Sequence, residues 1–164
     1  MNTTSYPNPT IETFPEQLLV GLHMEMSVAN NTTGLLWATL GPRIKEIKNI
    51  SANYKISLQE YPIHYFKQFN PNSVFTKWAL IPVYNIADVS EGLESYTISE
   101  GLYAMFQYKG ASTNSSIFQY IFTEWLPKSP YILDHRPHFE VLGENYKNND
   151  DNSEEKIYIP VKLK

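Results

Sequence analysis

The sequence predicts one α+β domain built from two βαββ units, each an antiparallel sheet with one helix, packed pseudo-symmetrically around a central cavity. Three observations lead to this prediction. The order strand, helix, strand, strand occurs twice along the 164 residues. Strand segments alternate apolar and polar residues, whereas helical segments repeat apolar residues every three or four positions. Hydrophobic residues make up 42% of the chain and charged residues 18%, which suits a single domain with a real core.

The first unit is expected over about residues 15–88, after a polar and flexible tail over residues 1–14. Its predicted elements are a strand over 18–27, a helix that includes Leu36 and Ile47, and strands over 54–60 and 75–83. Gly41-Pro42 falls inside the helix. Because proline removes a backbone donor and clashes with the preceding turn, the helix is expected to kink or restart there.

The second unit is expected over about residues 93–164. Its predicted elements are a short strand over 93–98, a strand over 101–109, a helix over 117–125, and strands over 138–143 and 155–164. Residues 112–116 offer caps for the helix, and Pro127 is expected to stop it. The polar segment over 145–154 is predicted to be a loop.

The two units can be laid over each other. A shift of 83 residues places Ile56 on Phe139 and Gly21 on Ala104. We therefore expect an internal duplication, with repeats that meet at a groove. Junctions of this kind are common places for ligand pockets.

Composition excludes several classes of function. The net charge of −4 argues against a sequence-independent grip on nucleic acid, which needs clustered Lys and Arg. The chain has no cysteine, and no apolar run approaches the length of a membrane span. His135 and His138 are close in sequence but lack a third ligand, so no metal site is expected, and no cofactor motif is present. A cytoplasmic protein is the default expectation.

One carboxylate stands out against an unusually aromatic composition of 12 Tyr, 8 Phe and 3 Trp. Glu140 lies between Phe139 and Val141 in a predicted strand, so alternation places it on the face opposite Phe139. The residues alone leave two readings open: a side chain facing water, or an acid in an aromatic pocket.

The motifs of the second half resemble the GyrI-like effector-binding domain, the sensor module of many AraC-type and MerR-type bacterial regulators. The matching segments are Gly101-Leu102-Tyr103-Ala104, Tyr108-Lys109-Gly110, Trp125-Leu126-Pro127, Pro137-His138-Phe139-Glu140 and Ile157-Tyr158-Ile159-Pro160-Val161. In the first half, Val20-Gly21-Leu22 and Leu36-Trp37 match the usual opening of the family. The resemblance covers roughly residues 14–164.

The resemblance implies a pocket between the repeats for hydrophobic, often cationic compounds. It assigns a buried acid to Glu140 and a pocket tyrosine to Tyr158, with Trp37 and Tyr120 as aromatic walls. Further pocket candidates, from their positions in the repeats, are Phe106, Leu80 and Trp78. An acid in such a pocket is expected to have a raised pKa and to be stabilised by a bound cation.

Three functions remain open at this point. The first is a sensor or sequestering module of multidrug type, which binds amphipathic cations. The second is a hydrolase of reactive electrophiles with Glu140 as its general base, as in some proteins of similar fold. The third is a protein-interaction module, such as a gyrase inhibitor. About 14 residues precede the predicted domain, too few for a helix-turn-helix unit, so a role in transcription is expected to require a partner protein.

Overall fold

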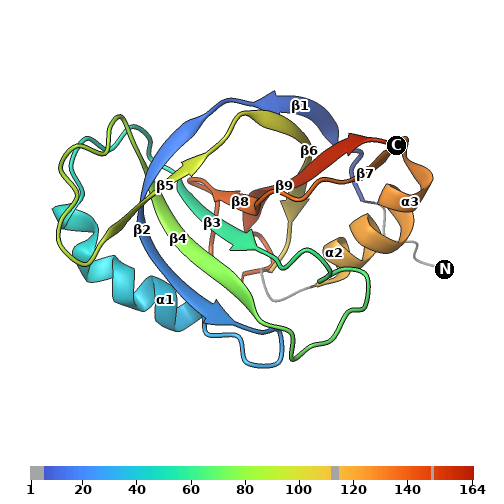
Figure 1. The fold of residues 1–164 in the computed structure, drawn as a ribbon, viewed down its shortest axis with the longest axis horizontal. Coiled ribbons are helices and arrows are strands. Elements are labelled where there is room, and N and C mark those ends of the chain that lie inside the picture. Colours follow the sequence, from blue (N-terminus) through green and yellow to red (C-terminus); the bar gives the residue numbers. More distant parts are fainter. Residues whose placement is uncertain (1–5, 112–114, 149) are drawn as a thin grey trace.

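Antiparallel strands form one strongly curved sheet in the computed structural model, which describes residues 6–111, 115–148 and 150–164. The strand order is β1-β6-β9-β8-β3-β4-β2-β5, and β7 pairs with β9 (Figure 1). The strands are β1 (Thr10–Phe14), β2 (Gln17–Met26), β3 (Lys55–Glu60), β4 (Phe75–Val83), β5 (Glu94–Ile98), β6 (Gly101–Lys109), β7 (Tyr131–Leu133), β8 (His138–Leu142) and β9 (Glu154–Leu163). The helical segments are α1 (Thr33–Leu40), η1 (Gly41–Glu46), α2 (Ser116–Tyr120), η2 (Ile121–Trp125) and α3 (Leu126–Lys128).

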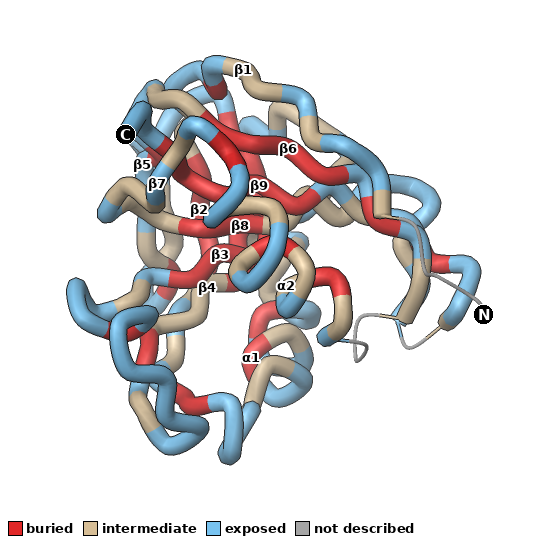
Figure 2. Tube along the Cα trace, turned by 90° about the vertical axis from the view of Figure 1, so that its right-hand side faces the viewer, coloured by how far each residue is buried: buried red, intermediate tan, exposed pale blue. Residues whose placement is uncertain are grey.

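The connection between β1 and β2 explains the curvature. β1 is one edge strand and β2 is next to the other edge, yet only Pro15 and Glu16 separate them in the chain. The sheet must therefore bend back on itself into a nearly closed barrel. Its interior is apolar and strongly aromatic, and it consists of Phe14, Leu19, Ile56, Leu58, Leu80, Ile98, Tyr103, Met105, Phe139 and Tyr158. Figure 2 shows the buried residues concentrated in the central strands.

The strand register shows which side chains point out of the barrel. Ser57 of β3 lies opposite Ala79 of β4 and opposite Glu140 of β8. Glu140 in turn lies opposite Ile157 of β9. Directly opposed residues of antiparallel strands share a face, so these four residues lie on one outer face of the sheet. We call this outer face the helix face.

Two helical segments cover the two ends of the helix face. The first consists of α1 and η1, and the second consists of α2, η2 and α3. Leu36 and Leu40 of α1 pack with Ala79 in one buried cluster. Ile117 and Ile121 of the second helical segment pack with β6 and β9 in another. Strands β3 and β8 therefore lie between the two helices (Figure 1). Among the described residues, no helix has the length and apolar character needed to cross a bilayer.

Most predicted elements are confirmed, and the helix does change character at Gly41, where α1 gives way to the 3-10 segment η1. The expectation of a tail over residues 1–14 needs correction, because Thr10–Phe14 forms β1 and pairs with β6. β7 is also additional. Pro127 lies within the last helical turn rather than beyond it, after a π-helical stretch over Ile121–Trp125. The cap candidates at 112–114 and the tail residues 1–5 lie outside the described residues, as does residue 149 of the expected loop.

The strand order is the same from either edge toward the centre. β1-β6-β9-β8 on one side corresponds to β5-β2-β4-β3 on the other. The shift of 83 residues agrees with this for Ile56 and Phe139, which both point into the barrel. It does not hold for the first strands, because Gly21 is paired with the interior residue Leu80 whereas Ala104 packs on the helix face. The duplication itself stays a prediction.

Candidate functional site

A polar strip crosses the middle of the helix face. Gln59 of β3 donates a hydrogen bond from Nε2 to Oε2 of Glu140 at 3.0 Å. Gln59 is only 4% exposed, and Glu140 is partly buried. Alternation brings them to this face, because Leu58 and Phe139, their neighbours in sequence, fill the barrel interior.

Two further charged groups belong to the strip. Lys77 of β4 lies directly opposite Gln59, and Glu155 of β9 is two positions before Ile157, the partner of Glu140. Register and the period of two therefore place both side chains on the helix face. Lys77 and Glu155 are, like Glu140, partly buried. Four adjacent strands thus contribute two carboxylates, one ammonium group and one amide to the strip, and we call Lys77, Glu140 and Glu155 the ionic trio.

Burial and mutual charge shift the pKa values of the ionic trio. Burial raises the pKa of Glu140, while the positive charge of Lys77 and the hydrogen bond from Gln59 oppose the rise. Burial and the negative charge of Glu140 raise the pKa of Glu155 to about 8. Burial lowers the pKa of Lys77, and the two carboxylates work against that change. The low-dielectric surroundings therefore disfavour a net charge within the trio.

Aromatic side chains bridge one end of the strip. Phe66, in the segment after β3, stacks on Phe122 of η2 with a centroid distance of 4.9 Å. Phe66 also stacks on His138 of β8 at 5.3 Å, and Tyr61 meets the same imidazole edge-on at 4.9 Å. Burial, aided by the nearby Arg136, lowers the pKa of His138 to about 3, so this imidazole is neutral at pH 7. The bridge is thus uncharged and provides π faces beside the ionic trio.

A hollow of about 400 Å³ opens on the other side of Tyr61. Its lining residues are Glu25, Glu60, Tyr61, Pro62, Val74, Phe75 and Thr76. A second hollow, of about 270 Å³, is lined by residues of the second helical segment, including Tyr120 and Glu124. Glu140 lines neither, so the geometry of the strip rests on strand register and contacts and not on these two hollows.

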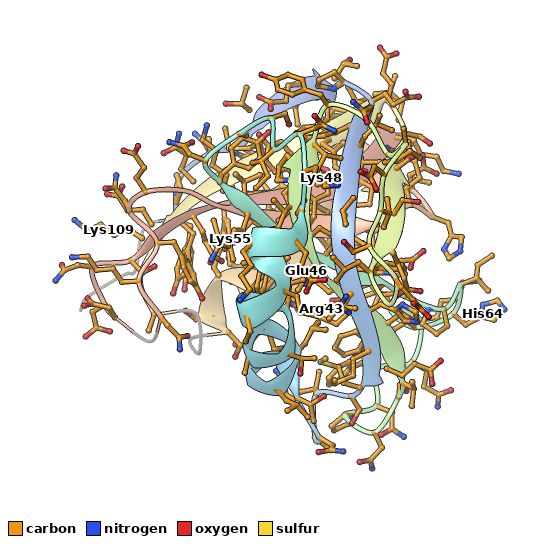
Figure 3. All side chains as sticks on the ribbon, turned by 90° about the vertical axis from the view of Figure 1, so that its left-hand side faces the viewer. Arg43, Glu46, Lys48, Lys55, His64 and Lys109 are labelled. Atoms are coloured by element: carbon orange, nitrogen blue, oxygen red, sulfur yellow. The ribbon has the colours of Figure 1, made fainter. Side chains whose placement is uncertain are left out.

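Three of the residues predicted from the sequence lie on the helix face or its helices, in different surroundings. Trp37 of α1 is partly buried, and its ring centroid lies 5.9 Å from Nζ of Lys55, which is exposed (Figure 3). Phe106 is fully buried and packs edge-on against Trp125 at 5.2 Å. Tyr120 stacks on Tyr6 at 4.7 Å. Trp37 and Tyr120 are both partly exposed, as a wall residue must be, whereas Phe106 is a packing residue.

The structure corrects the predicted positions of Tyr158, Leu80 and Trp78, which lie on the barrel side of the sheet. Tyr158 stacks on Phe139 at 4.7 Å and is 6% exposed. Leu80 is fully buried, and Trp78 donates a hydrogen bond from Nε1 to Glu60 at 2.6 Å. The strand register explains this. Glu140 is opposite Ile157, so the next residue of β9, Tyr158, lies on the opposite face of the sheet, inside the barrel.

Sequence reasoning missed several residues of the strip, namely Gln59, Lys77, Glu155, Tyr61, Phe66 and Phe122. A signal was present for two of them. Gln59 alternates with the apolar Leu58, and Lys77 interrupts an otherwise apolar strand. Nothing in the sequence aligned these two residues with Glu140, because that requires the pairing of β4, β3 and β8.

The curved antiparallel sheet, with two helical regions on one face and a partly buried polar strip between them, defines the class of this α+β domain. The family model of the GyrI-like small molecule binding domain matches residues 7–162. The chain therefore belongs to the GyrI-like family. A comparison with curated protein sequences gave no match.

Solved structures show the same fold at low sequence identity. The C-terminal domain of EcmrR superposes with a TM-score of 0.72 at 12% identity, covering 98% of this chain and 100% of that chain. SAV2435, solved bound to tetraphenylphosphonium, gives a TM-score of 0.66 at 14% identity, with 95% and 94% covered. A hydrolase encoded by lin2189 from Listeria innocua gives 0.62 at 11% identity, with 94% and 92% covered.

Proposed function

We propose that this domain binds lipophilic organic cations at the polar strip, with Glu140 as the counter-charge. The observation that supports this most directly is a partly buried carboxylate, hydrogen-bonded by Gln59, on the part of the helix face that lies between the two helical regions. The similar protein SAV2435 was solved with a lipophilic phosphonium cation. We further propose a role as a cytoplasmic sensor or sequestering module that acts with a DNA-binding partner, since the similar protein EcmrR was solved in complex with DNA.

Charge and π faces together account for broad selectivity. An ionised Glu140 in low-dielectric surroundings attracts a cation more strongly than it would in water. The rings of Tyr61, Phe66 and Trp37 are available for cation–π contacts of about 0.5–2 kcal/mol each. Such a site selects for charge and apolar bulk, which many compounds share, and this is the multidrug behaviour expected from the sequence. We expect entry of a guest to displace Phe66 from its contact with Phe122.

The test compares two ions of the same shape and opposite charge. Tetraphenylphosphonium and tetraphenylborate are titrated into the wild-type protein and into the Glu140→Gln variant, with calorimetric detection. We expect the wild type to bind the cation at least about tenfold more tightly, equivalent to about 1.4 kcal/mol. In Glu140→Gln, which preserves shape and hydrogen-bonding capacity, that preference should fall by about tenfold or more.

Two outcomes would contradict the proposal. Equal affinity of the wild type for both ions would show that charge plays no part in recognition. A preference that survives unchanged in Glu140→Gln would place the recognition elsewhere on the molecule. Melting temperatures of both proteins without ligand serve as the control for folding.

Tyr158→Phe provides a second prediction, because Tyr158 belongs to the barrel interior. Removal of its hydroxyl should change the affinity for tetraphenylphosphonium by less than about twofold, since residues on the opposite face of the sheet do not touch the guest. The measurement is the same titration. A loss as large as that of Glu140→Gln would return Tyr158 to the binding site.

A hydrolase is the second candidate, and the raised pKa of Glu155 favours it. A carboxyl with a pKa of about 8 beside a second carboxylate has the pairing needed for a general acid and a general base. Incubation with strained electrophiles, followed by mass spectrometry, distinguishes the two candidates. Recovery of every compound unchanged would exclude catalysis on that panel and leave binding as the function.

A further inference from the structure

The ammonium group of Lys77 lies on the same face of the sheet as the two carboxylates and reduces their combined negative charge. Lys77 shares the helix face with Glu140 and Glu155, on strands that are neighbours in the order β9-β8-β3-β4. Gln59, between them, donates its hydrogen bond to Glu140 and has no charge of its own. Lys77 therefore interacts electrostatically with both carboxylates, and the negative charge of Glu140 also acts on Glu155.

We propose that Lys77 sets the valence of the guest, so that the site accepts one positive charge and disfavours two. This inference rests on the proposed function and names the charge class of its ligand. With both carboxylates ionised, the trio has a net charge of −1. A monovalent cation brings the site to neutrality, whereas a divalent guest leaves an excess positive charge in partly buried surroundings, which is costly.

The other ionisable groups that face the trio do not alter this charge count at pH 7. His138 on β8 is neutral, since its pKa is about 3. Burial raises the pKa of Tyr61, of Tyr65 and of Tyr108 on β6 above the ordinary tyrosine value, so all three keep their protons. Lys55 on β3 shares the face, but it is exposed to water and lies beside Trp37 of α1.

The net charge of the ionic trio also predicts that a proton is released when a cation binds. Without a guest, the net negative charge is reduced by a proton on the carboxylate pair, which agrees with a pKa of about 8 for Glu155. A bound cation takes the place of that proton and allows both carboxylates to ionise. Affinity for a monovalent cation should therefore rise with pH below about 8, by at most about tenfold per unit, and level off above that value.

Lys77→Met tests the valence directly, because methionine keeps an unbranched apolar chain and removes the charge. The probes are tetraphenylphosphonium, with one charge, and butane-1,4-bis(triphenylphosphonium), with two. We expect the ratio of affinities to move at least about tenfold toward the divalent probe in Lys77→Met. Lys48→Met is the matched control, since it removes the same charge from an exposed residue whose ion-pair partner is Asp88 rather than a member of the trio, and it should leave the ratio unchanged (Figure 3).

Proton release is the second readout, and it needs only the wild type and Glu155→Gln. Titration of tetraphenylphosphonium at pH 7 in phosphate and in Tris buffer separates proton transfer from the heat of binding. We expect about one proton released per cation in the wild type and close to none in Glu155→Gln.

The possible failures have different signatures. An affinity ratio that is the same in Lys77→Met and in the wild type would overturn the role of Lys77 alone. A wild type that binds the cation with no proton released would overturn the predicted proton exchange at the carboxylate pair. A wild type that binds neither cationic probe would overturn the proposed function as well. Lys77→Gln also removes the charge and provides the affinity ratio if Lys77→Met does not fold.

Discussion

Replacement of Phe139 by alanine is expected to lower the free energy of unfolding by about 3–5 kcal/mol, the range for a large aromatic side chain removed from a core. Phe139 is fully buried. Its ring stacks on Tyr158 at 4.7 Å and meets Phe14 and Tyr103 edge-on at 4.8 and 5.1 Å. These three partners come from three different strands, β9, β1 and β6, so the cavity left by the alanine cannot close without moving the barrel wall. Urea denaturation of both proteins gives the difference.

Phe69→Ala is the matched control for that loss, because the same side chain is deleted from a residue that is 60% exposed. Its expected cost is below about 1 kcal/mol. Similar losses in the two variants would contradict the assignment of Phe139 to the principal core. A further requirement is that Phe69→Ala leaves the dependence of the unfolding free energy on urea unchanged.

Gly21→Ala is expected to cost about 3 kcal/mol or more, as a severe case of overpacking. A Cβ atom at this position would overlap the carbonyl oxygen of Ala79 and approach the backbone of Leu80. Both obstacles belong to the backbone of β4, which pairs with β2 over nine residues from Leu18 to Met26. Since that backbone cannot yield without loss of ladder hydrogen bonds, the strain should appear in full as a lower melting temperature.

Gly34→Ala makes the same chemical change where space is free, because nothing lies within 4 Å of the added Cβ in α1. Alanine is the better helix former, so this variant should be unchanged or more stable by up to about 1 kcal/mol. Thermal unfolding followed by circular dichroism measures both variants. A Gly21→Ala protein as stable as Gly34→Ala would contradict the close approach of β2 and β4.

The sequence was sufficient for those parts of the fold that depend on local pattern. Alternation located β2, β3, β4, β6, β8 and β9, and Gly41-Pro42 marked the change from α1 to η1. The local sequence pattern was insufficient for β1, because Thr10–Phe14 is a short edge strand whose pairing with β6 joins residues far apart in the chain. Such non-local pairing overrides the polar composition that indicates a tail.

The candidate site was predictable within a strand but not between strands. Alternation around Phe139 placed Glu140 on the opposite face, as the structure has it. The places of Lys77 and Glu155 in the strip depend on how β9, β8, β3 and β4 are aligned. The wrong position predicted for Tyr158 has the same origin. A slip of one residue in that alignment exchanges the two faces, and hydrophobicity alone does not fix it here because both faces contain apolar clusters.

The division of β3 and β8 into inward and outward residues separates two properties that often conflict in proteins. Leu58 and Phe139 hold the barrel together from within, whereas Gln59 and Glu140 beside them lie on the helix face, where we propose that the guest binds. On that proposal, exchange of Gln59 or Glu140 would alter which compounds are preferred while leaving the side chains of the barrel interior unchanged. The proposed guest preference and the stability of the barrel would then depend on different residues of the same two strands.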